Sequence, residues 1–264
     1  MRIALGIEYN GAAYCGWQYQ DHSPSVQDCV EKALAHVANH DVRVICSGRT
    51  DTGVHAYSQV VHFDTTVIRP DHAWAFGANT KLPGDISILW AKQVDETFHA
   101  RFSAQSRVYR YVLLNRQIRP GLLRDRVSWD YRPLDLKRMQ RAAVHLIGEH
   151  DFTSYRAVAC QASSPVRILK RLEIHQADEL FTFELEANGF LHHMVRNIVG
   201  VLLTVGAGEA EPDWANEVLA KRDRTQGGLT APPDGLYFVG ARYPEEFEIP
   251  YLLATDLLPR GAVW

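Results

Sequence analysis

The chain has 264 residues, of which 46% are hydrophobic and 22% are charged, as in an ordinary globular protein with one large domain or two smaller ones. Its longest apolar run, 198–207, is far shorter than the roughly 18 residues of a membrane-spanning helix, so we expect no membrane partner. No secretory signal is recognisable, and the cysteines lack zinc-finger or redox spacing. We therefore expect a cytoplasmic protein with four reduced thiols, Cys15, Cys29, Cys46 and Cys160.

The charge is unevenly distributed along the chain. The net charge of −3 argues against a nucleic-acid partner, but the segment Arg101–Arg141 carries eleven basic and three acidic residues, a local charge of +8. Ten of the eleven are arginines, which bind phosphate through a bidentate fork and stack on bases. Aromatic residues are interleaved with them. The segment predicts a surface that binds RNA, and an ordinary solvated basic face is the alternative.

In the first part of the chain, period-two alternation predicts a half-buried strand over 2–8. Ser25 with Asp28 three residues later predicts the start of a helix that runs to about Asn39. A short helix is expected near 73–77. Further strands are expected at 42–46, 59–63 and 86–90.

In the second part of the chain, strong alternation predicts a strand over 107–115, in which Tyr109 and Arg110 face opposite sides. Helical periodicity predicts helices over 135–150, 192–205 and 213–221. A strand pair is expected at 168–175 and 181–187, followed by a last strand at 236–241. Strands and helices alternate irregularly, which favours an α+β fold with a largely antiparallel sheet flanked by helices.

The most informative segment is the run from Gly48 to Ala56, which places a single carboxylate, Asp51, between two glycines and two residues after Arg49. The glycines let the backbone turn between two strand-like runs, so that Asp51 is held on a loop. An ionised carboxylate beside an arginine is either a nucleophile or a structural ion pair. An aspartate that only bonds its own backbone in the turn is a further structural alternative.

Other catalytic signatures are missing. The sequence has no P-loop, no dinucleotide-binding glycine motif, no zincin His-Glu-x-x-His motif and no nucleophile elbow. The adjacent His192 and His193 invite a metal site, but neighbouring residues on a helix diverge by about 100° and do not easily share one ion. A lone carboxylate without a metal, a cofactor or a second carboxylate fits few hydrolase mechanisms. It suits attack on an electrophilic carbon.

The run from Gly48 to Ala56 closely resembles the Gly-Arg-Thr-Asp-Ala-Gly-Val-His segment of the tRNA pseudouridine synthase A family, which isomerises uridines 38, 39 and 40 in the tRNA anticodon stem-loop. The resemblance extends over nearly the whole chain. Further similar segments are 9–18, 82–86, 98–111, 148–152, 188–200 and 235–237. The resemblance implies two RNA-recognition-like halves that share a sheet, with a basic cleft between them. We expect residues 1–105 to form the half with the Asp51 loop and residues 106–264 to complete the cleft.

The resemblance also implies roles for individual residues. Asp51 matches the family's nucleophile, and Arg49 matches the arginine that pairs with it and fills the space of the flipped base. Tyr109 matches the tyrosine that stacks on the target base, and Leu236 matches an apolar residue near that base. We also expect Arg110, within the basic segment, to contribute to substrate binding. The family works as a homodimer and without metal or cofactor.

Two positions depart from the family pattern, Thr52 in place of alanine and Lys81 before Leu-Pro. Neither is one of the matched site residues. Isomerisation breaks the N1–C1′ bond, rotates the base and rejoins it through C5. Three routes satisfy this chemistry: attack of Asp51 on C1′, attack on C6, or abstraction of a sugar proton towards a glycal-like state. A non-catalytic RNA-binding module of the same fold and a metal-dependent nucleic-acid hydrolase are the alternatives, and turnover without added metal separates the three.

Overall fold

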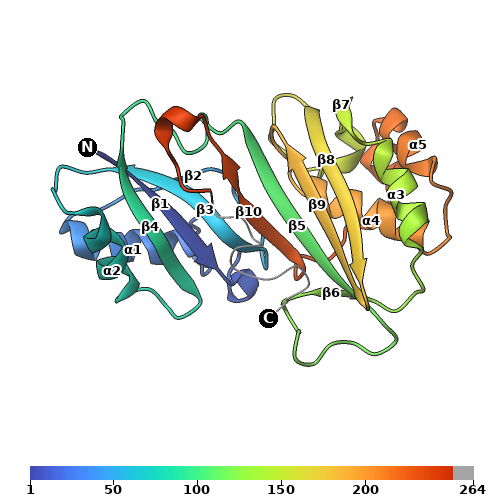
Figure 1. The fold of residues 1–264 in the computed structure, drawn as a ribbon, viewed down its shortest axis with the longest axis horizontal. Helices are drawn as coiled ribbons and strands as arrows, with labels where there is room; N and C mark the ends of the chain where they lie inside the picture. Colours follow the sequence, from blue (N-terminus) through green and yellow to red (C-terminus); the bar gives the residue numbers. More distant parts are fainter. Residues whose placement is uncertain (252–264) are drawn as a thin grey trace. The chain divides into compact units, whose positions relative to one another are not determined.

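The computed structural model describes residues 1–251, which form two compact units. The first unit contains Met1–Arg107 and residues 237–251, and the second contains Val108–Leu236. Each combines a sheet of mostly antiparallel strands with helices, so the predicted α+β class is confirmed (Figure 1). None of the helices in the described range is long and apolar enough to cross a bilayer.

The sheet of the first unit has the order β4-β1-β3-β10, and the short β2 also pairs with β3. In chain order its elements follow the pattern βαββαβ, a split β-α-β arrangement. Strands β1 and β3 are antiparallel with Leu5 opposite Val61, whereas β10 runs parallel to β3 with Tyr237 opposite His55. The strands are β1 (Arg2–Tyr9), β2 (Ile45–Cys46), β3 (His55–Asp64), β4 (Ile86–Val94) and β10 (Leu236–Arg242).

Two helices, α1 (Val26–Ala38) and α2 (Asp71–Asn79), pack against each other in this unit. The predicted cap of α1 is confirmed, because the Ser25 hydroxyl accepts a hydrogen bond from the Asp28 amide at 3.4 Å. Helix α1 ends at Asn39, whose left-handed backbone (φ 56°) is a common helix stop. Helix α2 is longer at both ends than the predicted 73–77.

Strand β1 is buried on both faces, which corrects the expectation of a half-buried strand. On the face opposite Ile3 and Leu5, Ala4 packs with Val60 and with Phe98 from the segment after β4. The C-terminal residues Tyr243 and Phe247 pack against the same cluster. The sequence alternates large apolar residues with small ones such as alanine, and this pattern is typical of a strand with one buried face. The small residues of β1 nevertheless lie on a second buried face.

The sheet of the second unit has the order β5-β9-β8-β7, with β6 added to β5. Strands β8 and β9 form a long antiparallel pair in which buried apolar residues alternate with polar ones. One face of this pair therefore packs on the core while the other presents charged side chains. The strands are β5 (Ser106–Asn115), β6 (Ser128–Asp130), β7 (Gly148–Asp151), β8 (Val166–Ala177) and β9 (Leu180–Ala187).

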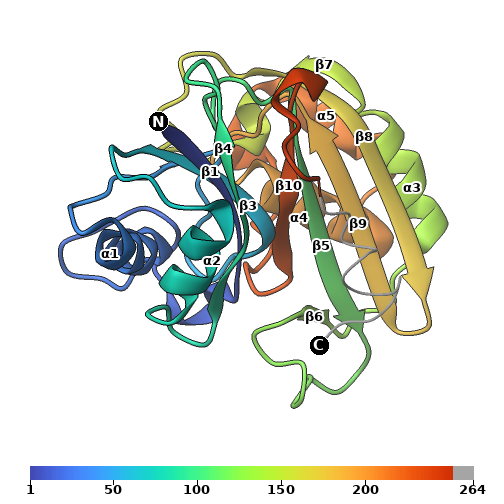
Figure 2. The same ribbon diagram turned by 60° about the vertical axis from the view of Figure 1, so that its left-hand side comes forward.

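Three helices pack in the second unit: α3 (Leu136–Val144), α4 (Met194–Gly206) and α5 (Trp214–Lys221). Helix α4 is almost entirely buried, and α3 lies alongside β8 (Figure 2). The predicted helix over 135–150 is too long, because α3 ends at Val144 and residues 148–151 form β7. Gly148 adopts a left-handed backbone (φ 113°), which is incompatible with helix continuation. Short 3₁₀ turns lie at Gly11–Ala13, Thr153–Tyr155, Arg224–Gln226 and Glu245–Phe247.

Candidate active site

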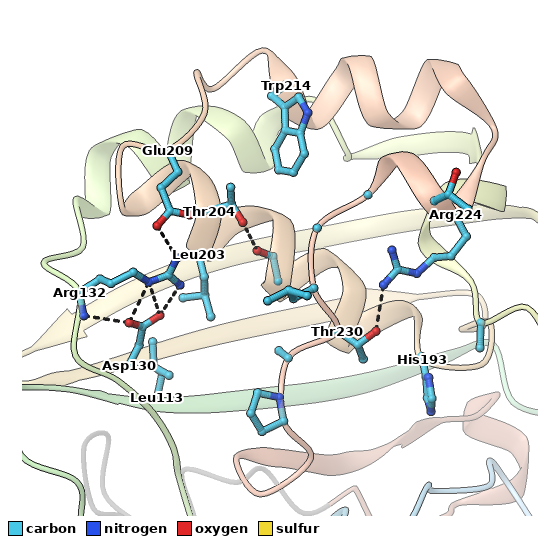
Figure 3. A pocket seen from close by; sticks show the side chains of 18 of the residues that line it. Leu113, Asp130, Arg132, His193, Leu203, Thr204, Glu209, Trp214, Arg224 and Thr230 are labelled. Carbon is cyan, nitrogen blue, oxygen red and sulfur yellow. Dashed lines mark hydrogen bonds and ion pairs between the residues drawn. The ribbon is translucent and has the colours of Figure 1, made fainter.

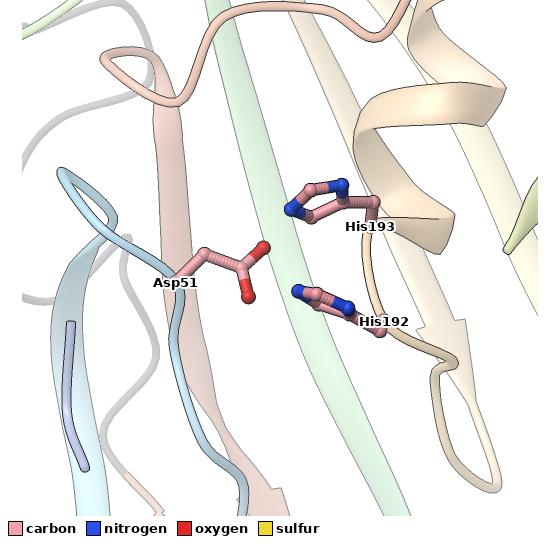
Figure 4. Close-up of side chains that lie close together, drawn as sticks. All are labelled: Asp51, His192 and His193. Atoms are coloured by element: carbon pink, nitrogen blue, oxygen red, sulfur yellow. The ribbon is translucent and has the colours of Figure 1, made fainter. Parts of the chain in front are cut away.

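Asp51 lies on the loop between β2 and β3 of the first unit (Figure 4). Its side chain is half-buried, whereas the neighbouring Arg49 is exposed. The Asp51 carbonyl accepts a hydrogen bond from the Val54 amide at 3.1 Å, and Gly53 adopts φ 78°. This tight turn needs a glycine at position 53 and fixes the backbone that carries the carboxylate.

Hydrogen bonds from the end of β1 and from the segment after it hold the loop in place. The hydroxyl groups of Thr50 and Tyr9 hydrogen-bond at 2.8 Å in the interior, and the Trp17 amide donates to the Thr50 carbonyl at 3.0 Å. A Cβ at Gly16 would lie 2.6 Å from that same carbonyl oxygen, so only glycine allows this approach. The residue directly before Asp51 is therefore immobilised at both its backbone and its side chain.

A second set of hydrogen bonds holds the start of the loop. The Gln59 amide group donates to the Gly48 carbonyl at 2.6 Å and accepts from the Ser47 hydroxyl at 2.7 Å. The guanidinium of Arg107 donates to the Ser47 carbonyl at 3.2 and 3.3 Å. Nothing in the sequence indicated these contacts, because the residues that make them lie far apart in the chain.

Aromatic rings follow directly after the loop. The His55 Nδ1 accepts a hydrogen bond from the Gly11 amide at 3.1 Å, so this nitrogen carries no proton. The His55 ring stacks on Tyr237 with centroids 4.6 Å apart, and Tyr57 stacks on the same Tyr237 at 5.0 Å. The sequence offered one signal for His55, namely its place at the end of the Gly48–Ala56 run.

Tyr109 lies on β5 in the second unit and is 9% exposed. Its ring meets Phe190 edge to face, with centroids 5.0 Å apart and an interplanar angle of 81°. Tyr111, on the same side of the strand, is fully buried, and its hydroxyl group hydrogen-bonds the Ser128 hydroxyl at 2.6 Å and lies 3.0 Å from the Pro232 carbonyl oxygen, which can only accept. Of the two tyrosines, Tyr111 therefore has a structural role, and Tyr109 has an oriented ring.

Arg110 lies on the opposite side of β5 from Tyr109, as the strand alternation requires. Its Nε donates to a carboxylate oxygen of Glu184 on β9 at 3.1 Å, and Arg171 donates to the other oxygen at 3.0 Å. Burial favours the neutral carboxyl, but the hydrogen bond and charge of Arg110 and the charge of Arg171 hold the pKa of Glu184 below its ordinary value. Arg110 thus pairs with Glu184 on one face of the sheet, whereas Tyr109 lies on the other face.

Leu236 is 4% exposed and begins β10. Its amide donates to the Pro233 carbonyl at 2.8 Å. A Cβ at the preceding Gly235 would lie 2.1 Å from the Val112 carbonyl oxygen on β5, so this glycine is needed for the close approach of the two segments. A tight backbone contact at the preceding residue therefore fixes the chain where Leu236 begins β10.

Much of the charge in the basic segment Arg101–Arg141 is paired with carboxylates. Arg132 contacts both Asp130 and Glu209, the latter at 2.9 Å. Arg110, Arg116, Arg124 and Arg138 each contact a carboxylate as well. The local charge of +8 therefore overstates the charge that this segment offers to a partner.

His192 and His193 precede α4 and are not part of it (Figure 4). Their ring centroids are 4.1 Å apart, and His193 has a left-handed backbone (φ 61°). The prediction that the two side chains diverge as neighbours on a helix is wrong, because α4 begins at Met194.

A groove of about 970 Å³ lies within the second unit, between α4 and the segment that leads to β10 (Figure 3). Arg224, one of its lining residues, donates to Asn197 on α4 at 3.0 Å and to Thr230 at 2.9 Å. Asp130 and Arg132 form an ion pair at its other end. Nothing in the sequence indicated this groove, because its walls come from six separate segments between residues 113 and 232.

Two comparisons of the sequence with known proteins agree on one family. A sequence model described as tRNA pseudouridine synthase matches residues 6–103 and 142–244. A tRNA pseudouridine synthase A of Coxiella burnetii (strain Dugway 5J108-111) is 58% identical over 98% of this chain and 99% of its own length. The Pseudomonas aeruginosa (strain PAO1) protein of that name is 56% identical over 94% and 88%. A chain of the solved Cbf5-Nop10-Gar1 complex matches at 11% identity over 76% of this chain and 45% of its own, with a TM-score of 0.36, a likeness too weak to assign a fold.

Proposed function

The chain belongs to the tRNA pseudouridine synthase family and is an isomerase that converts uridine to pseudouridine in tRNA; on this premise we propose that it acts on uridines 38, 39 and 40 of the anticodon stem-loop, with Asp51 as nucleophile. The observation that carries the proposal is the Gly48–Ala56 loop, which has the family's motif and is fastened through Thr50. A carboxylate on a rigid loop reaches the same position in every turnover.

The reaction itself needs no external oxidant or reductant. The N1–C1′ bond of uridine breaks, a C5–C1′ bond forms, and the proton on C5 is lost while N1 gains one. A carboxylate can attack C1′ of the sugar, add to C6 of the base, or remove a sugar proton, and each is a route by which the N1–C1′ bond breaks while the base stays in the site. Asp51 is the carboxylate that we propose for this step, and no metal or cofactor is required.

Arg49, Tyr109 and Leu236 complete the proposed site. Arg49 is exposed on the same loop as Asp51, and we propose that it fills the space left by the flipped base. Extrusion of a base costs a few kcal/mol, and a guanidinium that takes its place recovers part of this cost. Tyr109 stacks on the uracil, and Leu236 packs near it. The oriented ring of Tyr109 against Phe190 supports its part in this proposal.

We propose a less direct role for Arg110. Its ion pair with Glu184 supports a function in holding β5 against β9, through which it affects the position of Tyr109. We further propose that the enzyme works in the cytoplasm as a homodimer, as the family resemblance implies.

Tritium release tests the activity and the position together. A tRNA transcript in which every uridine, including those at positions 38, 39 and 40, carries ³H at C5 is incubated with the enzyme in the presence of a chelator, and release of tritium is followed. We expect release to continue with chelator present and to vanish when these three uridines are replaced by cytidine. Release that persists from the replaced tRNA would show that the target positions are elsewhere, and arrest by the chelator would show a metal requirement.

A further inference from the structure

An exposed aromatic and cationic cluster lies on the segment between β4 and β5 of the first unit. It consists of His99, Arg101 and Phe102, and we name it the Phe102 platform. Phe102 is 75% exposed, and its ring lies 4.4 Å from the His99 ring at an angle of 33°. The guanidinium carbon of Arg101 lies 5.5 Å from the centre of the Phe102 ring. The aromatic face of Phe102 and the positive charge of Arg101 therefore lie side by side on the surface.

The platform is held rigidly from beneath. The His99 Nδ1 accepts hydrogen bonds from the amides of Arg101 at 3.1 Å and Phe102 at 3.2 Å, and the His99 amide donates to the Ser103 hydroxyl at 2.9 Å. Arg2 on β1 donates to the Phe98 carbonyl at 2.8 Å. An exposed phenylalanine on a backbone this well fixed loses little entropy when a flat partner stacks on it.

Hydrogen bonds connect the platform to the loop of Asp51. Arg107 donates to the carbonyl groups of Arg101 and Ala104 on one side and to that of Ser47 on the other. Ser47 immediately precedes the Gly48–Ala56 run. Burial raises the pKa of the Cys46 thiol to about 11, and the charges of both Arg49 and Arg101 oppose this rise. Both cations therefore lie in one region of the first unit.

We propose that the Phe102 platform stacks an unpaired nucleotide of the substrate tRNA, with Arg101 on an adjacent phosphate. The inference rests on the proposed function. When a target base is flipped out, its neighbours lose a stacking partner. An aromatic side chain accepts any base on its π face, and arginine adds cation–π and phosphate contacts. The platform would thus hold the strand beside the target while tolerating different bases at that position.

The test compares Phe102 with Phe76, which is 73% exposed on α2 of the same unit and also neighbours a histidine ring, His72. The variants are Phe102→Ala, Phe102→Tyr, Arg101→Gln and the control Phe76→Ala. Affinity for an unmodified tRNA transcript is measured by fluorescence anisotropy over a range of salt, and single-turnover tritium release is measured separately.

We expect Phe102→Ala to weaken binding on the order of tenfold, whereas Phe102→Tyr and Phe76→Ala retain wild-type affinity. Arg101→Gln should flatten the log–log salt dependence by about one contact, a slope change of about 0.7 to 0.9. The proposal is overturned if Phe102→Ala binds tRNA as wild type does. It is also overturned if Phe102→Ala changes only the oligomeric state in sedimentation, which would assign the platform to a second copy of the chain. Wild-type enzyme that neither binds nor converts the tRNA would instead refute the proposed function.

Discussion

At the scale of single residues, the carboxylate of Asp51 owes its placement to its neighbours. Thr50 is hydrogen-bonded through both its hydroxyl and its carbonyl, so the chain direction at the next residue is set before any substrate arrives. Such preorganisation is a general source of catalytic rate, because the reacting group need not be brought into position during the reaction. We therefore expect substitution of Asp51 to abolish turnover, and substitution of Thr50 to lower both the stability and the rate.

Asp51→Asn preserves the shape of the side chain but removes its negative charge. We expect isomerisation to fall to background while the Kd for tRNA changes little, since the proposed nucleophile would act on the reacting atoms and not on the RNA backbone. Single-turnover tritium release and equilibrium binding measure the two effects. Turnover within about tenfold of wild type would remove Asp51 from the chemistry.

Tyr109 is tested with two substitutions that separate its ring from its hydroxyl. Tyr109→Phe keeps the ring against Phe190, whereas Tyr109→Leu removes the aromatic face. If stacking dominates, we expect the phenylalanine variant to bind tRNA normally and the leucine variant to bind on the order of tenfold more weakly. A loss of rate without a loss of affinity in Tyr109→Phe would assign proton transfer to the hydroxyl. Wild-type kinetics in both variants would exclude Tyr109 from the site.

At the scale of elements, the loop between β2 and β3 depends on contacts from β1 and the segment after it. Thr50→Val removes the hydroxyl that bonds Tyr9, whereas Thr50→Ser keeps it. We expect Thr50→Val to lower the free energy of unfolding by about 1 kcal/mol and to reduce the single-turnover rate more than tRNA affinity. Urea unfolding and tritium release measure both. Equal rates in Thr50→Val and Thr50→Ser would show that the hydroxyl does not position Asp51.

The contact between β3 and the segment after β4 should make the protein sensitive to acid. His62 on β3 is 2% exposed and accepts the Ala100 amide proton at Nδ1, at 3.1 Å. Burial, with help from the charges of Arg2 and His99, lowers the pKa of His62 to about 4. The unfolded chain binds this proton near pH 6.5, so the stabilisation is complete above that pH and is lost as pH falls towards 4.

When the pH falls from 7.5 to 5, we expect the titration of His62 to lower the free energy of unfolding by about 2 kcal/mol. His62→Asn retains an acceptor for the Ala100 amide but does not titrate. The difference in urea unfolding free energy between wild type and His62→Asn should therefore shrink or reverse at pH 5. The same difference at both pH values would contradict a depressed pKa for His62.

At the scale of the whole molecule, RNA binding depends on which cations remain available. Several arginines of the basic segment Arg101–Arg141 contact carboxylates, whereas Arg119, Lys137 and Arg141 are exposed. An ion pair on the protein already neutralises part of an arginine's charge, so these three should contribute more to phosphate binding.

Replacing Arg119, Lys137 and Arg141 together by glutamine should weaken tRNA binding and flatten the log–log salt slope by up to about 2. A control replaces Arg69 and Lys81, which are exposed beside α2, by glutamine. We expect the control to keep its salt slope. An unchanged slope in the first variant would show that the RNA lies elsewhere.

The sequence by itself determined the family, the loop of Asp51, the α+β class and the cap of α1 at Ser25. These features depend on residues close together in the chain: a turn with its glycines, a side chain that caps its own helix, and a motif of consecutive residues. Local periodicity also located most of the strands and helices, with errors mainly at their ends.

Only the tertiary structure decided the contacts between distant segments. It pairs β10 with β3, ends α3 at Val144, covers the second face of β1 with Phe98, and binds Arg110 to Glu184. The physical reason is common to all four. Burial and ion pairing depend on which surfaces meet after folding. The residues next to a charged or apolar side chain in the sequence do not indicate which distant residue it will contact.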